Sequence, residues 1–150
     1  MELIVKPDRV KAGLLGAKII AQVVRERADA VLGLATGSTP LSLYAELVRM
    51  HCEEGLSFKN VVTFNLDEYV GLDPSHPGSF HAVMEKHLFQ HLDLRPGATH
   101  LPDGCAADIP GSCEAYERSI KAAGGIDLQL LGIGGDGHLA FNEPGSSLSS

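Results

Sequence analysis

The segment AVLGLATGSTP, residues 30–40, indicates the fold more clearly than any other part of the chain. Its first six residues, Ala30 to Ala35, are apolar, and Thr36-Gly37-Ser38-Thr39-Pro40 follows as a turn that opens a helix. A short apolar run that ends in this way is typical of a buried strand. Val61 to Leu66 (VVTFNL) and Asp127 to Ile133 (DLQLLGI) have the same apolar character and predict two further strands.

Helical periodicity fills the sequence between these strands. Apolar residues recur at helical spacing over Asp8–Ala28, again from about Leu43, and then over Ser79–His91 and Ser112–Ala123. Strands without polar alternation, separated by helices, are typical of a parallel sheet that is covered on both faces. We therefore predict an α/β fold in a single domain over residues 1–150. Its core is an open, mainly parallel, Rossmann-like sheet with helices on both faces.

Composition excludes several classes of partner. The chain has a formal net charge of -7, whereas nucleic acids and acidic membranes are bound by clustered Lys and Arg, so we predict neither partner. No stretch approaches the roughly 18 apolar residues of a membrane span. The three cysteines form no C-x-x-C pair, and His87 and His91 share a predicted helix without a third ligand. We expect a soluble, cytoplasmic protein with reduced thiols and no metal site.

Ligands of open parallel sheets bind beyond the carboxyl ends of the strands, so the residues after each apolar run are the most informative. After the first run, Gly37 lets the backbone approach a ligand, and Thr36, Ser38 and Thr39 supply hydroxyl groups. The helix that begins near Pro40 directs free amides toward an anion. A phosphate monoester fits such a site. A capped turn without a ligand explains the same residues equally well.

Two adjacent carboxylates, Asp67 and Glu68, follow the second strand. Successive residues of a strand point to opposite faces, so we expect only one of the pair to enter the cleft, where it is a candidate general base. The other is expected to make structural hydrogen bonds. A purely structural cap remains the alternative for both residues.

A glycine-rich loop follows the third strand, and residues 132–137 match the pattern G-x-G-x-x-G. That dinucleotide fingerprint has to open a helix, but Asn142-Glu143-Pro144-Gly145 interrupts any helical pattern. We predict instead that the loop brings Asp136, His138 and Glu143 into one pocket. An imidazole transfers protons near neutral pH, and two carboxylates can fix its tautomer and support its charge.

Three segments together resemble the glucosamine-6-phosphate deaminase family. They are GLATGSTP (Gly33–Pro40), SFKNVVTFNLDEYVGL (Ser57–Leu72) and LLGIGGDGHLAFNEPGSSL (Leu130–Leu148), in the order and approximate spacing of the family. The resemblance implies aldose–ketose isomerisation with deamination, in which glucosamine 6-phosphate and water become fructose 6-phosphate and ammonia. This reaction belongs to amino-sugar (N-acetylglucosamine) catabolism, and the family uses neither a metal nor an organic cofactor.

The same resemblance implies a role for each candidate residue. Asp67 moves a proton between C2 and C1 of the open-chain sugar, and His138 assists opening of the pyranose ring. Asp136 and Glu143 tune the imidazole, while Thr36 to Thr39 lie along the sugar phosphate. The implied partner is therefore a small sugar phosphate. Members of the family differ in oligomeric state, so a homo-oligomer stays open.

Two other functions are compatible with these segments. The 6-phosphogluconolactonases share the fold and a DGH-like loop, although they are not expected to carry both FNLDEY and HLAFNEP. A sugar-phosphate-binding module without catalytic activity is the second alternative. Deaminases are also considerably longer and take the Arg and Lys of the phosphate site from sequence that would follow Ser150. We therefore expect the chain to be incomplete at its C-terminus, and to be poorly stable and inactive by itself.

Overall fold

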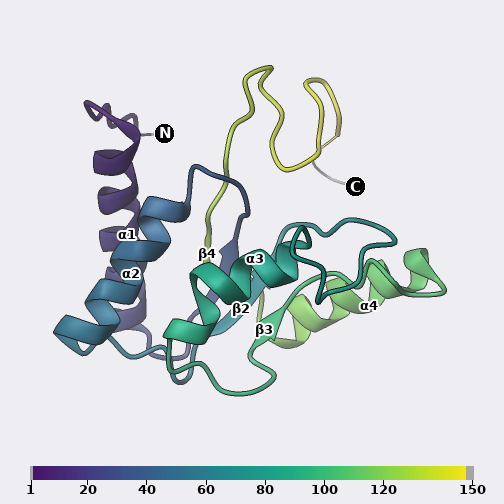
Figure 1. Ribbon diagram of the computed structural model, residues 1–150, viewed down its shortest axis with the longest axis horizontal. Helices are drawn as coiled ribbons and strands as arrows, with labels where there is room; N and C mark the ends of the chain where they lie inside the picture. The colour runs from purple at the N-terminus through teal and green to yellow at the C-terminus, as the bar shows by residue number, and fades with distance from the viewer. Residues whose placement is uncertain (1, 148–150) are drawn as a thin grey trace.

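A four-stranded sheet organises residues 2–147, which are the residues that the computed structural model describes (Figure 1). Its strands are β1 (Val31–Leu34), β2 (Val62–Asn65), β3 (Thr99–His100) and β4 (Leu128–Gln129), in the spatial order β3-β2-β1-β4. Each neighbouring pair is parallel. The prediction of an open parallel α/β sheet is confirmed.

Helices connect the strands and cover both faces of the sheet. They are α1 (Arg9–Glu26), α2 (Leu41–Glu54), α3 (Phe80–His87) and α4 (Ile109–Ala122), with the short 3-10 helix η1 (Phe89–His91) after α3. Three of the helices begin at residues whose side chains accept a hydrogen bond from the first turn: Asp8 for α1, Ser79 for α3 and Asp108 for α4.

The register of β1 and β2 assigns side chains to the two faces. Leu32 and Leu34 are buried in one cluster with the apolar sides of α1, α2 and α3. Gly33 is paired with Phe64, so these two residues face the other way, and the Phe64 ring meets Tyr116 of α4 edge-on at 5.7 Å between centroids. Three helices therefore cover one face of the sheet, and α4 lies on the opposite face.

The third predicted strand is the main error in the sequence-based assignment. Only Leu128 and Gln129 of Asp127–Ile133 pair as a strand, and within residues 2–147 this strand lies at an edge of the sheet. Leu130 makes one more hydrogen bond, from its amide to the Gly33 carbonyl at 2.8 Å, after which the chain leaves the sheet. Ile133 is consequently 77% exposed. The glycines after Leu131 permit this departure, because they weaken strand structure.

The other predicted helices and strands differ from the observed ones by smaller amounts. Strand β3 was not predicted, because its two residues are too few to produce a pattern. Helix α4 begins at Ile109 rather than Ser112, since Asp108 caps it and Pro110 lies in its first turn. The helix predicted for Ser79–His91 changes to a 3-10 turn at Leu88, whose φ of -140° is not helical.

The structure also bears on the membrane span, the cysteines and the third family-like segment considered from the sequence. Among the helices within residues 2–147, none is long and apolar enough to cross a membrane. Cys52, Cys105 and Cys113 are free thiols at the surface. Leu148, the last residue of the third family-like segment, lies outside the described residues.

Candidate active site

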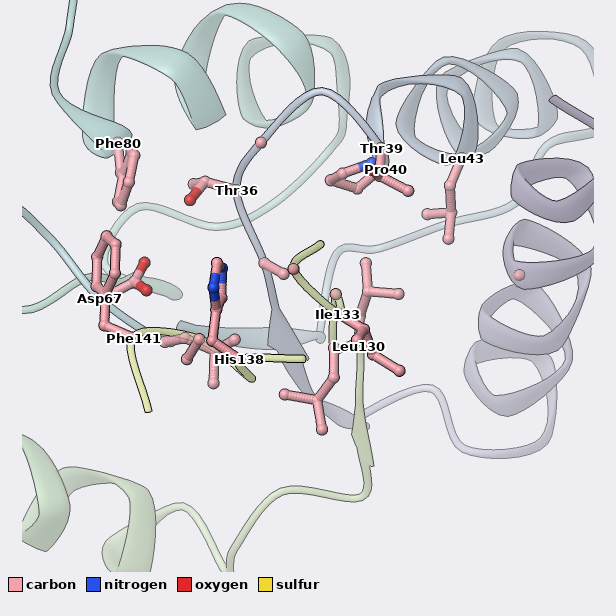
Figure 2. Close-up of a pocket in the computed structure, with 18 of the residues that line it drawn as sticks. Thr36, Thr39, Pro40, Leu43, Asp67, Phe80, Leu130, Ile133, His138 and Phe141 are labelled. Atoms are coloured by element: carbon pink, nitrogen blue, oxygen red, sulfur yellow. The ribbon is translucent and has the colours of Figure 1, made fainter. Parts of the chain in front are cut away.

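A cavity of about 520 Å³ opens beyond the carboxyl ends of β1 and β2 and is bordered by the loop after β4 (Figure 2). Five of the predicted site residues line it: Thr36, Gly37, Thr39, Asp67 and His138. Three predicted residues, Ser38, Asp136 and Glu143, do not line it. The parallel strands thus bring the three loops together at one edge of the sheet, as the rule for open α/β sheets requires.

The loop between β1 and α2 forms the part of the wall that suits an anion. Gly37 has a φ of +114°, a left-handed conformation that favours glycine, and it turns the chain from the strand toward the helix. Pro40 stands at the N-cap of α2, and no side chain caps the first turn of that helix. Its first amides and the positive end of its dipole are therefore available beside the Thr36 and Thr39 hydroxyls.

Asp67 and Glu68 separate as expected at the end of β2. Asp67 is half-buried and lines the cavity, and its side chain is directed into the same space as those of Thr36 and His138 (Figure 2). Burial raises the pKa of the Asp67 carboxyl above its usual value, and the negative charge of Glu68 raises it further. Glu68 does not line the cavity. Its carboxylate instead accepts hydrogen bonds from the amides of Phe80 and His81.

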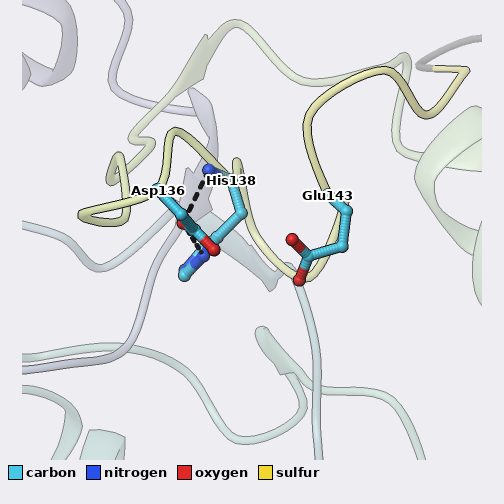
Figure 3. Close-up of side chains that lie close together, drawn as sticks. All are labelled: Asp136, His138 and Glu143. Atoms are coloured by element: carbon cyan, nitrogen blue, oxygen red, sulfur yellow. Dashed lines mark hydrogen bonds and ion pairs between the residues drawn. The ribbon is translucent and has the colours of Figure 1, made fainter.

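The glycine-rich loop after β4 brings Asp136, His138 and Glu143 together, with at least one donor atom of each within 4.8 Å of the others (Figure 3). The Asp136 carboxylate lies 2.6 Å from Nδ1 of His138 and also accepts the His138 backbone amide at 3.2 Å. These contacts, the backbone amide first, lower the pKa of Asp136. Asp136 thus remains an anion that holds the imidazole through Nδ1 and leaves Nε2 for other partners.

Glycine at position 134 is required by the packing of this imidazole. A Cβ built on Gly134 would overlap the ring of His138, so the ring lies directly on the peptide backbone. The Gly134 amide also donates to the His138 carbonyl at 2.9 Å. The loop therefore fixes the imidazole from two sides.

The Asp136, His138 and Glu143 set also has the size of a metal site. The sequence-based expectation of no metal is therefore a prediction that needs a direct test. The other histidine pair weighed for a metal is different, because Nε2 of His91 lies 3.0 Å from the Lys86 carbonyl oxygen in its own helical segment.

Sequence reasoning missed several residues that line the cavity. Tyr69, Phe80 and Phe141 form an aromatic cluster with centroid separations of 4.7 to 6.4 Å. Arg9, in the first turn of α1, also lines the cavity. Nothing in the local sequence marks Arg9, since an exposed Arg is ordinary at a helix start.

Comparisons with known proteins agree with this geometry. The family model described as glucosamine-6-phosphate isomerases/6-phosphogluconolactonase matches residues 11–146. A glucosamine-6-phosphate deaminase of Arthrobacter sp. is 55% identical over 150 residues, which are 100% of this chain and 58% of that protein. One of Porphyromonas gingivalis is 51% identical and is matched over 59% of its length. The chain thus spans a little under three fifths of these curated relatives.

Solved structures give the same result in three dimensions. A monomeric glucosamine-6-phosphate deaminase superposes with a TM-score of 0.97 at 44% identity, covering 100% of this chain and 62% of the other. The 6-phosphogluconolactonase of Thermotoga maritima is more distant, with a TM-score of 0.75 at 25% identity over 93% of this chain and 62% of the other. By sequence and by fold, the chain belongs to the glucosamine-6-phosphate isomerase/6-phosphogluconolactonase family.

Proposed function

We propose that the protein is a glucosamine-6-phosphate deaminase, which converts glucosamine 6-phosphate and water to fructose 6-phosphate and ammonia. The observation that carries this proposal is the meeting of three groups in one cavity: a half-buried carboxylate at Asp67, an imidazole at His138, and the open N-terminus of α2 beside Thr36 and Thr39. The names of the relatives support the same substrate.

The chemistry needs a separate group at each end of the sugar. In the open-chain form, a base removes the proton from C2 to give an enolamine, and the same group returns a proton to C1. The product is an imine at C2, which water hydrolyses to the ketone and ammonia. Asp67 suits the proton transfers because its raised pKa makes it a stronger base than an exposed aspartate.

The remaining groups bind and prepare the substrate. His138, held by Asp136 and near Glu143, exchanges a proton with the ring oxygen when the pyranose opens. The α2 N-terminus with Thr36, Gly37 and Thr39 receives the phosphate, since backbone amides and a helix dipole favour an anion. Arg9 lines the same cavity and is a candidate for binding the phosphate through its positive charge.

The direct test is an assay of the purified protein with glucosamine 6-phosphate, measuring ammonia and fructose 6-phosphate. Equal amounts of both products support the proposal, and treatment with EDTA is expected to leave the rate unchanged. Hydrolysis of 6-phosphogluconolactone without ammonia release would identify a lactonase instead. Binding of fructose 6-phosphate without turnover of either substrate would identify a binding module.

Two expectations of this proposal lie outside the cavity. The cytoplasmic location and the possible assembly of identical chains stay predictions. Fractionation of cells and analytical ultracentrifugation test them. A solved relative is described as monomeric, so a homo-oligomer is not required for the fold.

A further inference from the structure

Glu68 joins two elements that form the cavity. One carboxylate oxygen accepts the amides of Tyr69 at 2.8 Å and Phe80 at 3.0 Å, and the other accepts the His81 amide at 2.9 Å. Phe80 and His81 are the first two residues of α3. A single side chain thus connects the end of β2 to the start of α3, across a loop of ten residues from Val70 to Ser79.

This connection fixes the positions of Tyr69 and Phe80 in the cavity wall beside Asp67. Tyr69 and Phe80 both line the cavity, and their rings lie 4.7 Å apart. The Tyr69 carbonyl lies so close to Gly104 that a Cβ at Gly104 would overlap it, and the Gly71 amide donates to the Gly104 carbonyl at 2.7 Å. The residues that follow Asp67 are therefore fixed on one side by Glu68 and on the other by Gly104.

The negative charge of Glu68 also acts on Asp67. The Glu68 carboxylate accepts three backbone amides and lies at the positive end of α3, two features that favour a negative charge there. Asp67 lacks such amides, and two adjacent negative charges repel each other. The other ionisable residues that line the cavity are Arg9, Tyr69 and His138, and Tyr116 of α4 interacts with the charge of Asp67.

We propose that Glu68 is a positioning residue for the base of this active site: by binding the first amides of α3 it holds Asp67 against the aromatic wall. The negative charge of Glu68 also acts on the adjacent Asp67 carboxylate, because like charges repel each other. This inference rests on the proposed function for the role of Asp67 as a base, but its structural part does not need turnover.

Three variants separate the two actions. Glu68→Gln removes the charge and keeps one oxygen that can accept the amides of Tyr69 and Phe80, whereas its amide nitrogen cannot accept the His81 amide. Glu68→Asp keeps the charge but is too short to reach α3. Ser79→Ala is the matched control, because it removes the other cap of the same helix, the hydrogen bond from the Ala82 amide, without changing any charge.

The first measurement is a carbon-13 NMR titration of the Asp67 carboxyl in the free protein. We expect the pKa of Asp67 to fall in Glu68→Gln and to stay near its wild-type value in Glu68→Asp and Ser79→Ala. The amides of Phe80 and His81 should lose protection from hydrogen exchange in Glu68→Asp. An Asp67 titration that does not move in Glu68→Gln, or that moves equally in Ser79→Ala, would overturn the inference.

The second measurement is the pH dependence of ammonia release. The acidic limb of the kcat/KM profile should move to lower pH in Glu68→Gln, while Glu68→Asp should lower kcat without moving that limb. Unchanged kcat in Glu68→Asp would show that the connection to α3 does not position the base. If the wild-type protein releases no ammonia, the proposed function fails, and the titration still decides whether Glu68 controls Asp67.

Discussion

Asp67 is the residue on which the proposed chemistry depends most directly. Replacement by Asn removes the base and keeps the shape, so turnover should fall on the order of 10²–10⁴-fold while KM changes much less. The variant should also no longer exchange the C2 proton of the substrate with solvent, because the base that removes this proton is absent. Wild-type exchange in Asp67→Asn, measured by NMR in deuterated water, would assign the base to another residue.

The same substitution should not destabilise the fold. The raised pKa of Asp67 means that the folded state binds the proton more tightly than the unfolded state, so this group reduces stability as pH rises through its two pKa values. An amide cannot ionise and removes that loss. Urea unfolding at neutral pH is therefore expected to show Asp67→Asn at least as stable as the wild type. A clear destabilisation would contradict the assigned burial.

Gly134 and Gly135 provide a matched pair for testing the position of the imidazole. A Cβ at Gly134 overlaps the His138 ring, whereas a Cβ at Gly135 meets no atom within 4 Å. We expect Gly134→Ala to displace the ring and lower kcat by roughly 10–100-fold, because small misplacements of catalytic groups have effects of this order. Gly135→Ala should retain most of the activity. Equal rates in the two variants would show that the ring position is unimportant.

Arg9 is expected to bind substrate rather than to take part in the chemistry. It lies one turn before Gly13, where an added Cβ would overlap the Ser42 side chain at the start of α2, and it lines the cavity that holds the proposed phosphate site. A charge-assisted hydrogen bond contributes about 1.5–3 kcal/mol, so Arg9→Gln should raise KM about 10–100-fold at similar kcat. Arg118→Gln, on the exposed surface of α4, is the control.

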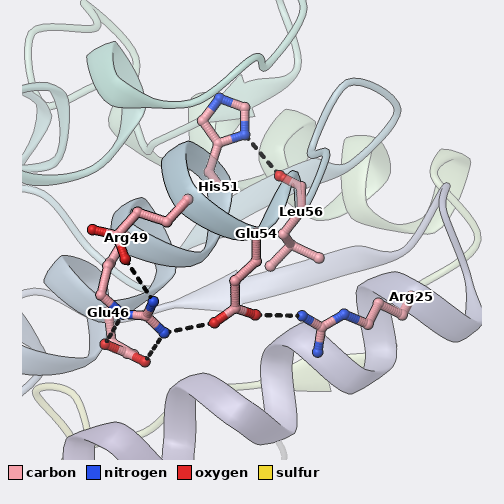
Figure 4. Close-up of polar contacts among 7 residues, drawn as sticks. Arg25, Glu46, Arg49, His51, Glu54 and Leu56 are labelled. Carbon is pink, nitrogen blue, oxygen red and sulfur yellow. Dashed lines mark hydrogen bonds and ion pairs between the residues drawn. The ribbon is translucent and has the colours of Figure 1, made fainter.

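At the scale of elements, α2 is attached to the sheet and to α1 in two different ways. Tyr44 is 1% exposed, and its hydroxyl donates to the carbonyl of Ala35, at the end of β1. At the other end of α2, Arg25 of α1 pairs with Glu54, which also pairs with Arg49 (Figure 4). These ion pairs are largely exposed, and such pairs contribute little to stability because water screens them.

Removal of the Tyr44 hydroxyl should therefore matter more than removal of the exposed ion pair. Tyr44→Phe leaves the Ala35 carbonyl without its buried donor, and we expect a loss of about 1–3 kcal/mol in the free energy of unfolding. Arg25→Met should change it far less. Urea denaturation measures both. A larger effect of Arg25→Met would mean that the α1–α2 pair, and not the buried hydroxyl, holds the helix.

For the whole molecule, stability is concentrated on the face of the sheet that carries α1, α2 and α3. Leu47 is 1% exposed within that core, whereas no residue of α4 is fully buried. Leu47→Ala should reduce the free energy of unfolding by about 2–5 kcal/mol. Val10→Ala, at a position that is 50% exposed, is the control and should change little. A small effect at Leu47 would indicate a loosely packed core.

The sequence by itself determined the α/β class, the first two strands, the approximate positions of the helices, and the loops that carry the candidate site. These features depend on local periodicity and turn chemistry, which are written in neighbouring residues. It also led to the expectation that Asp67 and His138 lie beyond the carboxyl ends of the strands, and both residues line the cavity at that edge of the sheet.

Only the tertiary structure decided which side chains share the cavity. Arg9 and Phe141 are 132 residues apart, and neither segment contains a signal for the other. It also decided that β3 exists, that β4 ends at Gln129, and that Glu68 binds the start of α3. Contacts between distant segments depend on how the helices pack against the sheet, and the period of one segment carries no information about that packing.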